Sequence, residues 1–350
     1  MDDNEKLGSA MQMLGLSPEI ERARFAELFE KYSKATYLDV RLDPGFKRLL
    51  KNEAAMVSFL NAILHRETDF IKSVEFMDTD IEIHATDLLN LRMDIHAKTE
   101  SGLQINVELQ KLSLTLFNER AILQESAVLC VEKKRLDAKI KEKYPSDSAH
   151  DIAEREKHRY EIPHVYAVWI CDFNVNEIGE YYDSWHIYSD KAVKRSAASA
   201  TPLPVTEKVK YIVVDLKKFK KTASELKNDE DRWLYLIKNA GVMKKLPKFN
   251  DSVLDDAVKR ITIDANRDKK ILEDQVSCTI SIDEQIGRMV LAHFDGKNEG
   301  RIEGKNEAKY EAAEAFLREG DPAERVARVL KLPLEKVQEL ADKIAAEKSL

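Results

Sequence analysis

The stretch from Arg92 to Gln110 limits the possible folds of this chain more than any other, because it predicts a single β-hairpin. Apolar and polar residues alternate strictly on both sides of a short turn at residues 100–102. This is the pattern of two paired strands with one apolar and one polar face. The polar face is predicted to carry Arg92, Asp94, His96, Lys98, Gln104, Asn106, Glu108 and Gln110.

A symmetric closure of this turn places Thr99 opposite Leu103 and Asp94 opposite Glu108. Residues directly opposite each other have Cβ atoms roughly 4.5–5.5 Å apart, and like charges at that distance destabilise a hairpin. A divalent cation between the two carboxylates would remove this penalty. Asp94 and Glu108 are therefore candidate metal ligands.

Two other interpretations of the polar face stay open from the alternation alone. The first is the solvated face of an antiparallel sheet, which is normally polar. The second is a charge ladder in which Arg92 and Lys98 neutralise the acids, each exposed pair contributing only about 0–1 kcal/mol. Gln110 favours a functional site, because it lies on the same face two residues beyond Glu108. His96 is predicted to be a hydrogen-bonded surface residue rather than a ligand.

The composition predicts a soluble protein: 43% of the 350 residues are hydrophobic and 34% are charged. The chain has no run of about 18 apolar residues, which argues against a membrane span. The acidic start MDDNEK argues against a signal peptide. The 3 cysteines contain no CxxC pair, so we expect reduced thiols and a cytoplasmic location.

The formal net charge of −7 counts mildly against a nucleic-acid partner, because dedicated DNA-binding domains are often basic. Overall charge does not exclude a local basic cleft, and enzymes that contact DNA briefly can be acidic. The choice between these classes therefore depends on the candidate site.

The order of helical and strand-like periodicities predicts an α/β fold, with a mixed sheet flanked by helices and an all-helical C-terminal extension. Asp43 is the predicted N-cap of a helix that begins at Phe46, with Pro44 at its first position. Helices are predicted at 1–35, 46–66, 112–141 and 223–295, strands at 71–84, 92–110, 164–173, 181–189 and 209–219, and a loop or frayed helix at 142–160. The predicted domains are a helical lead-in (1–42), a core (43–245), a helical extension (246–295), and a linker helix with a small helical module (296–350).

The C-terminal module is predicted to hold three short helical pieces, separated by Gly320-Asp321-Pro322 and by Lys331-Leu332-Pro333. This spacing resembles a helix-turn-helix unit. As a DNA reader, the module would present Arg325, Arg328, Lys331 and Lys336 to phosphates. As a packing or dimerisation module, it would form a small core from Leu317, Val326, Val329, Leu330, Leu334, Val337 and Leu340. The second interpretation is favoured because glutamates interrupt any basic face, and it allows for a homodimer.

An aspartate followed by Glu-x-Gln on the next strand of a hairpin is an arrangement used for metal-dependent phosphodiester cleavage. Asp94 and Glu108 offer hard oxygen ligands that suit Mg²⁺, and a bound metal lowers the pKa of water and stabilises charge on the phosphate. Gln110 would position the water or hydrogen-bond the phosphate. A glutamine supplies no charge, so the metal would carry more of the electrostatic work.

In these residues the chain resembles the PD-(D/E)XK nuclease superfamily, and within it the Rpn-like recombination-promoting nucleases, or PD-(D/E)XK nuclease family transposases. The order of several short motifs along the chain carries the resemblance. They are Asp43-Pro44-Gly45-Phe46-Lys47, residues 59–64 (FLNAIL), Asp94, Glu108-Leu109-Gln110, Phe117 with Arg120, and Leu216-Lys217-Lys218-Phe219. Gln124 and Glu125 depart from the pattern, because aromatic residues usually follow the arginine of that helix.

The resemblance implies a restriction-endonuclease-like fold and a Mg²⁺-dependent DNA endonuclease, with Mn²⁺ able to substitute for Mg²⁺. It assigns Asp94 and Glu108 as metal ligands and Gln110 as the third catalytic position, with a backbone carbonyl of Val107 or Leu109 completing the coordination. Glu53 and Arg120 are second-tier candidates. DNA is the implied partner, in recombination, mobile-element movement or phage defence. The alternatives are a catalytically silent binding module with a nuclease fold, and a structural protein without a metal.

Overall fold

A computed structural model describes residues 18–65, 68–81, 91–113, 116–175, 177–196, 202–264 and 266–347. Its contacts divide the chain into two compact units, one of Arg22–Thr279 and one of Met1–Glu21 with Ile280–Leu350. Helix α10 (Lys269–Glu319) contributes residues to both units. The domain boundaries at 42, 245 and 295 stay a prediction.

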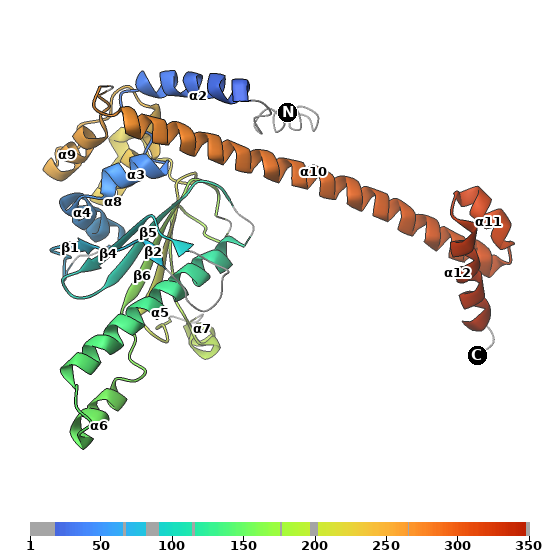
Figure 1. Ribbon diagram of the computed structural model, residues 1–350, viewed down its shortest axis with the longest axis horizontal. Helices are drawn as coiled ribbons and strands as arrows, with labels where there is room; N and C mark the ends of the chain where they lie inside the picture. Colours follow the sequence, from blue (N-terminus) through green and yellow to red (C-terminus); the bar gives the residue numbers. More distant parts are fainter. Residues whose placement is uncertain are drawn as a thin grey trace. The chain divides into compact units, whose positions relative to one another are not determined.

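The larger unit is built on a six-stranded sheet with the order β1-β4-β5-β6-β8-β7 (Figure 1). Neighbouring strands β5, β6 and β8 run parallel, and the other pairs run antiparallel. The predicted mixed sheet is therefore confirmed. The strands are β1 (Val74–Phe76), β4 (Ile95–Thr99), β5 (Gln104–Gln110), β6 (Val165–Cys171), β7 (Tyr182–Trp185) and β8 (Val209–Asp215), with a small separate pair of β2 (Asp80–Ile81) and β3 (Leu91–Arg92).

Helices flank this sheet, as predicted. Phe117 and Ala121 of α5 pack with Trp169 of β6 and Val213 of β8 in one buried cluster, so α5 covers one face. On the other side of the pleat, Ile105 and Val107 are fully buried. The helices of this unit are α2 (Pro18–Ser33), α3 (Asp43–Leu50), α4 (Glu53–Ile63), α5 (Phe117–Lys143), α6 (Ala149–Lys157), α7 (Asp190–Ser196), α8 (Asp229–Asn239), α9 (Ser252–Ile261) and the first part of α10, with 3₁₀ turns at Ala223–Glu225 and Ala240–Val242.

The prediction of one continuous helix at 46–66 is wrong, because the structure has two helices there. Helix α3 ends before Lys51, and the Asn52 side chain accepts a hydrogen bond from the Ala55 N–H (3.1 Å) to begin α4. An Asn N-cap is a strong helix-start signal, and it outweighs the continuous apolar periodicity. Asp43 is not an N-cap: Leu42 precedes α3, and Asp43 lies in the first turn.

Two further boundaries differ from the prediction. Helix α5 begins at Phe117 rather than at 112, after Leu116 in a left-handed conformation (φ 66°). The polar stretch 142–160 contains α6, whose N-cap Ser148 accepts a hydrogen bond from the Asp151 N–H (3.2 Å).

The C-terminal helices α10, α11 (Ala323–Leu330) and α12 (Leu334–Glu347) confirm the three predicted pieces. Leu317, Val326 and Val337 share a buried cluster, as the packing interpretation predicts. Two residues assigned to that core are instead exposed, Val329 by 61% and Leu334 by 48%. A short helix can turn only one narrow face toward its neighbours, so not every apolar residue finds cover.

None of the helices that the structure describes is long and apolar enough to cross a membrane.

Two glycines allow three segments to close around Asp39. A Cβ added to Gly45 would lie 2.9 Å from Gln275 Nε2 and closer still to the Asp39 carbonyl oxygen. A Cβ on Gly241 would lie 2.5 Å from Asp39 Cγ. Gln275 also donates a hydrogen bond to the Asp39 carbonyl (2.8 Å). Asp39 is thus fixed by α3, by the turn after α8 and by α10.

We expect Gly45→Ala to destabilise the protein by about 1–3 kcal/mol, the usual cost of forcing an extra carbon into a packed site. The matched control is Gly296→Ala in α10, where an added Cβ meets nothing within 4 Å. Alanine is favoured over glycine inside a helix by about 1 kcal/mol. Urea unfolding of the two variants should therefore shift in opposite directions. Equal shifts would show that the approach to Asp39 is not tight.

Candidate active site on the central hairpin

The hairpin register matches the prediction. Ile95 pairs with Val107 and Lys98 with Gln104, and the Thr99 N–H donates to the Leu103 carbonyl at 2.9 Å. The ladder ends at the pair of Ile95 and Val107, and Asp94 and Glu108 are the next residues along the two segments.

Backbone hydrogen bonds hold the two acids in place reciprocally. The Asp94 N–H donates to Glu108 Oε1 (3.1 Å), and the Leu109 N–H donates to Asp94 Oδ2 (2.7 Å). An ionised carboxylate has about four lone-pair sites. Each acid therefore keeps acceptor capacity beyond the bond that orients it.

Burial is the main cause that raises the pKa of both acids. Glu108 is only 3% exposed, and the neighbouring Asp94 raises its pKa further. Asp94 is half-buried, and the Asp43 carboxyl adds to the rise of its pKa while Lys47 opposes it. The backbone bonds favour the charged forms but do not overcome burial and repulsion. Burial and mutual repulsion therefore favour the protonated forms of the two acids.

Asp43 is the site residue that the sequence reasoning missed. It was treated as a helix cap, yet the first turn of α3 brings its carboxyl close enough to Asp94 to raise the pKa of that group. Lys47, one turn further along α3, forms an ion pair with Asp43 (2.7 Å). The Asp-x-x-Phe-Lys spacing contained this signal, because it places the acid and the lysine on one helix face.

The structure places Glu53 apart from this group. Glu53 begins α4 and is exposed, and it is not among the charges that shift the pKa of Asp94 or Glu108. Its role as a second-tier site residue stays a prediction.

Gln110 lies beyond Glu108 on β5, and its Nε2 donates to the Leu112 carbonyl at 2.9 Å. The guanidinium of Arg120 lies over the Trp169 ring, 5.9 Å from its centroid. Trp169 is the β6 partner of Glu108 in the ladder. Within the described part of the chain, Arg120 forms no ion pair with Glu108 or any other acid. The catalytic roles of Gln110 and Arg120 stay predictions.

The solvated-face interpretation is wrong, because α5 covers the polar face of the hairpin. His96 is 2% exposed, so the expectation of a surface histidine is also wrong. The Lys98 half of the charge ladder is not formed, because among the described side chains Lys98 has no ion-pair partner; the Arg92 side chain lies outside those that the structure describes. Alternation distinguishes two faces of a strand but cannot tell which of them a distant helix covers. The buried polar layer consists of His96, Gln104, Asn106 and Glu108 from the hairpin with Gln124, Glu125 and Glu132 from α5.

Glu125 and Asn106 are the members of this layer whose two side-chain polar atoms both have no hydrogen-bond partner among the described residues. Glu125 is 1% exposed. Burial raises its pKa to about 8. Glu125 is therefore neutral when the protein folds at neutral pH.

The donors around Asp94 and Glu108 fit a hard divalent cation. In an antiparallel ladder, Leu109 would exchange both backbone bonds with Met93. Here the Met93 N–H donates to the Thr79 carbonyl instead (2.9 Å), which leaves the Leu109 carbonyl on the side of Asp94 without that ladder donor. Two carboxylates and a carbonyl suit Mg²⁺, which usually keeps several waters. In the described ranges, no three His, Cys, Asp or Glu side chains group closely enough to hold a metal by themselves.

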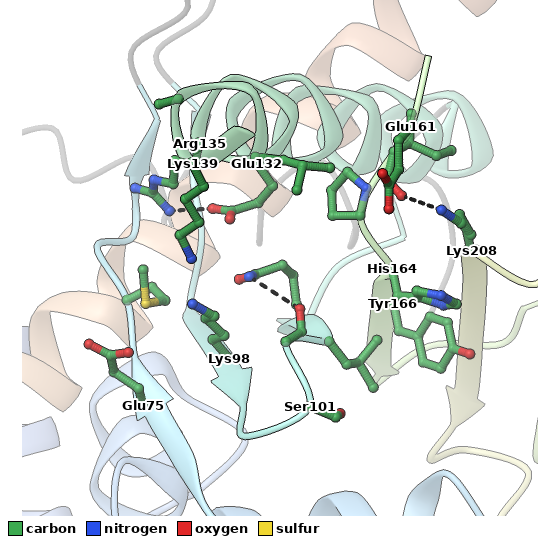
Figure 2. A pocket seen from close by; sticks show the side chains of 18 of the residues that line it. Glu75, Lys98, Ser101, Glu132, Arg135, Lys139, Glu161, His164, Tyr166 and Lys208 are labelled. Atoms are coloured by element: carbon green, nitrogen blue, oxygen red, sulfur yellow. Dashed lines mark hydrogen bonds and ion pairs between the residues drawn. The ribbon is translucent and has the colours of Figure 1, made fainter. Parts of the chain in front are cut away.

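A cavity of about 960 Å³ lies elsewhere, at the other end of β5. Figure 2 shows Lys98 and Lys139 pointing into it, while Arg135 holds Glu132 at its edge. Gln104, at the start of β5, lines this cavity, whereas Glu108 and Gln110 do not. The cavity is therefore separate from the acid pair. Although it is large, it contains neither Glu108 nor Gln110 and is not the candidate active site.

Comparison with known proteins gives one match. The profile of the family described as PD-(D/E)XK nuclease family transposase matches residues 40–287. A search of curated proteins and a search of solved structures found no match. The matched range contains α3, the hairpin, α5 and every strand of the sheet.

We expect Glu125→Gln to remove part of the pH dependence of stability. Above its ordinary pKa of 4.5 and up to about 8, Glu125 is ionised in the unfolded chain and protonated in the folded one. The free energy of unfolding therefore falls as pH rises through this window, by at most about 1.4 kcal/mol per pH unit. Glutamine cannot ionise, so the variant should show a shallower fall.

Urea unfolding across this pH window measures the slope. The matched control is Glu119→Gln, an exposed position on the same helix, which should keep the wild-type slope. Identical slopes for wild type and Glu125→Gln would contradict a neutral buried Glu125.

Proposed function

The chain belongs to the PD-(D/E)XK nuclease family transposases, and from this membership we propose that it is a metal-dependent DNA endonuclease whose centre is the Asp94–Glu108 pair. One observation carries the proposal: two acids with raised pKa values face each other on a hairpin, and backbone N–H groups orient both. Such a pair is costly unless a cation binds to it.

Asp94, Glu108 and the Leu109 carbonyl would hold Mg²⁺, with Mn²⁺ as a substitute. When bound, the cation supplies a water of lowered pKa and stabilises charge on the phosphate. Asp94 and Glu108 would hold the cation as carboxylates, and the hydrogen bonds from the Asp94 N–H and the Leu109 N–H keep both groups in position. Asp43 and Lys47 adjust the charge beside Asp94.

The proposed reaction is hydrolysis of a DNA phosphodiester. The water oxygen forms a bond to phosphorus, one ester P–O bond breaks, and the departing sugar oxygen takes up a proton. Gln110 would orient the water or hydrogen-bond the phosphate once its amide leaves the Leu112 carbonyl. The transposase description of the family supports a role in recombination or mobile-element movement, and phage defence would use the same chemistry.

We expect purified protein to nick supercoiled plasmid with Mg²⁺ or Mn²⁺ and not with EDTA. Asp94→Asn and Glu108→Gln should each lower the rate at least about 100-fold, because both remove a charged ligand. Glu180→Gln is the control, since Glu180 is exposed and lies outside the site. Cleavage that survives both site variants would place the activity elsewhere. Absence of cleavage with either metal would favour the silent binding module.

A second pair of variants compares the contributions of Asp43 and Glu53 to cleavage. Asp43→Asn should lower metal-dependent cleavage by about 10–100-fold, the usual effect of a residue that supports metal ligands, because Asp43 acts on Asp94. Glu53→Gln should retain activity, because its side chain is exposed and does not act on the pair. Melting temperatures with and without Mn²⁺ show whether each variant still folds and binds the ion. The reverse order of activities would restore Glu53 as the site residue.

A further inference from the structure

Three cationic side chains converge on one buried carboxylate at the edge of the sheet. Asp172 follows β6, and its Oδ1 lies 3.1 Å from Lys217 Nζ. Its Oδ2 lies 3.6 Å from Lys111 Nζ and 3.8 Å from Arg41 Nη1. Asp172 itself is only 8% exposed. We call Arg41, Lys111 and Lys217 the edge cations.

This edge is continuous with the candidate active site. Lys111 directly follows Gln110, and the Asp172 N–H donates to the Gln110 carbonyl at 2.9 Å. Lys217 follows Asp215, the last residue of β8. Because β5, β6 and β8 are parallel, their carboxyl ends meet at one edge. Loops at such ends commonly bind ligands in α/β sheets.

Electrostatics also connects Lys111 with the acids. The thiol of Cys278 on α10 has a pKa raised chiefly by burial; a backbone hydrogen bond with Asp43 and the charge of Lys111 lower this pKa, whereas the charges of Asp43 and Asp94 raise it. Lys111, Asp43 and Asp94 therefore lie within electrostatic reach of the same atom. The edge cations and the acid pair border one region of the larger unit.

Arg41 is held rigidly. Its Nε donates to Asp39 Oδ1 (3.0 Å) and its Nη2 to Asp39 Oδ2 (2.9 Å). Asp39 is in turn fixed by the close approaches of Gly45, Gly241 and Gln275 described above. A guanidinium has five N–H groups, and the two that bind Asp39 leave both N–H groups of Nη1 for a further acceptor, with Asp172 Oδ2 at 3.8 Å.

The two lysines are held more loosely. Neither makes a hydrogen bond with Asp172; both are close to it only as ion pairs. Lys217 is half exposed and Lys111 is about one-quarter exposed. Among the described residues, the three cations form ion pairs only with Asp39 and Asp172, although Lys111 also lies within electrostatic reach of the acid pair. The exposed ammonium of Lys217 and the close approach of three cations suit an anionic ligand at this edge.

We propose that the edge cations form a phosphate-binding subsite for the DNA backbone, which places the strand against the Asp94–Glu108 pair; the inference rests on the proposed function for its substrate. Arg41 would supply a rigid contact, and Asp39 is its positioning residue. Lys111 and Lys217 would neutralise phosphates as mobile point charges. Contacts of this kind position the substrate without reading its sequence.

The test is fluorescence anisotropy of a labelled DNA duplex with full-length protein in EDTA, so that no cleavage occurs. The Lys111→Ala/Lys217→Ala double variant should raise Kd about tenfold or more. It should also lower the slope of log Kd against log salt by about 2, since each phosphate contact contributes about 0.9. Lys134→Ala on α5 is the control, because Lys134 is exposed and lies outside the edge; it should match wild type.

A second variant separates binding from folding. Asp172→Asn removes the carboxylate that the edge cations share, so it should lower Kd, the opposite of the lysine variants. A loss of fold would raise Kd in both, and melting temperatures identify that case. For the positioning residue, Asp39→Asn should raise KM for cleavage with kcat largely retained, because it frees Arg41 without touching the acid pair.

The outcomes distinguish this inference from the proposed function. Wild-type Kd and salt slope in the double variant, or weaker binding by a folded Asp172→Asn, would overturn the subsite even if plasmid cleavage depends on Asp94. Failure of wild type to bind DNA at low salt would overturn it as well. Conversely, lysine-dependent binding without metal-dependent cleavage would support the subsite and overturn the nuclease.

Discussion

Repulsion between two carboxylates organises the centre of this protein. Backbone hydrogen bonds at the end of the hairpin hold Asp94 beside Glu108; Glu108 is buried against α5, whereas Asp94 lies next to Asp43 and Lys47 of α3. The closeness of the two carboxylates and the burial of Glu108 together leave two like charges near each other with little water around them. Backbone N–H groups donate hydrogen bonds to both carboxylates, and Lys47 lies near Asp94. These contacts orient the acids but do not neutralise their negative charge. A nearby positive charge would therefore stabilise the pair.

The charged residues around the acid pair are unevenly distributed. Asp43 adds a further acid where charge is already unfavourable, and the edge cations lie just beyond Gln110. A site that concentrates negative charge cannot attract DNA by itself, whereas a neighbouring cationic edge can. The overall charge of −7 conceals this local separation. Net charge describes the whole surface and therefore does not reveal a local cationic edge.

The parts of the site that the sequence predicted are those that depend on local geometry. The hairpin register follows from alternation and a short turn, so the pairing of Asp94 with Glu108 was predictable. Asp43 reaches the site through the packing of α3, and Asp39, Arg41 and Asp172 meet from separate segments. The burial of His96 depends on α5, which lies later in the chain, and the burial of Glu125 depends on how α5 packs on the sheet. Pattern analysis describes each element alone, and such contacts arise only when elements pack.

The parallel ladder has a consequence for the order of assembly. The β4–β5 hairpin closes across three residues. In contrast, Gln104 of β5 pairs with Val165 of β6, and α5 and α6 lie between these two residues in the sequence. Contacts between residues distant in sequence form more slowly, because a long loop must be closed first. The closeness of Asp94 and Glu108 is therefore set by a local contact, whereas the burial of Glu108 depends on contacts between residues distant in sequence.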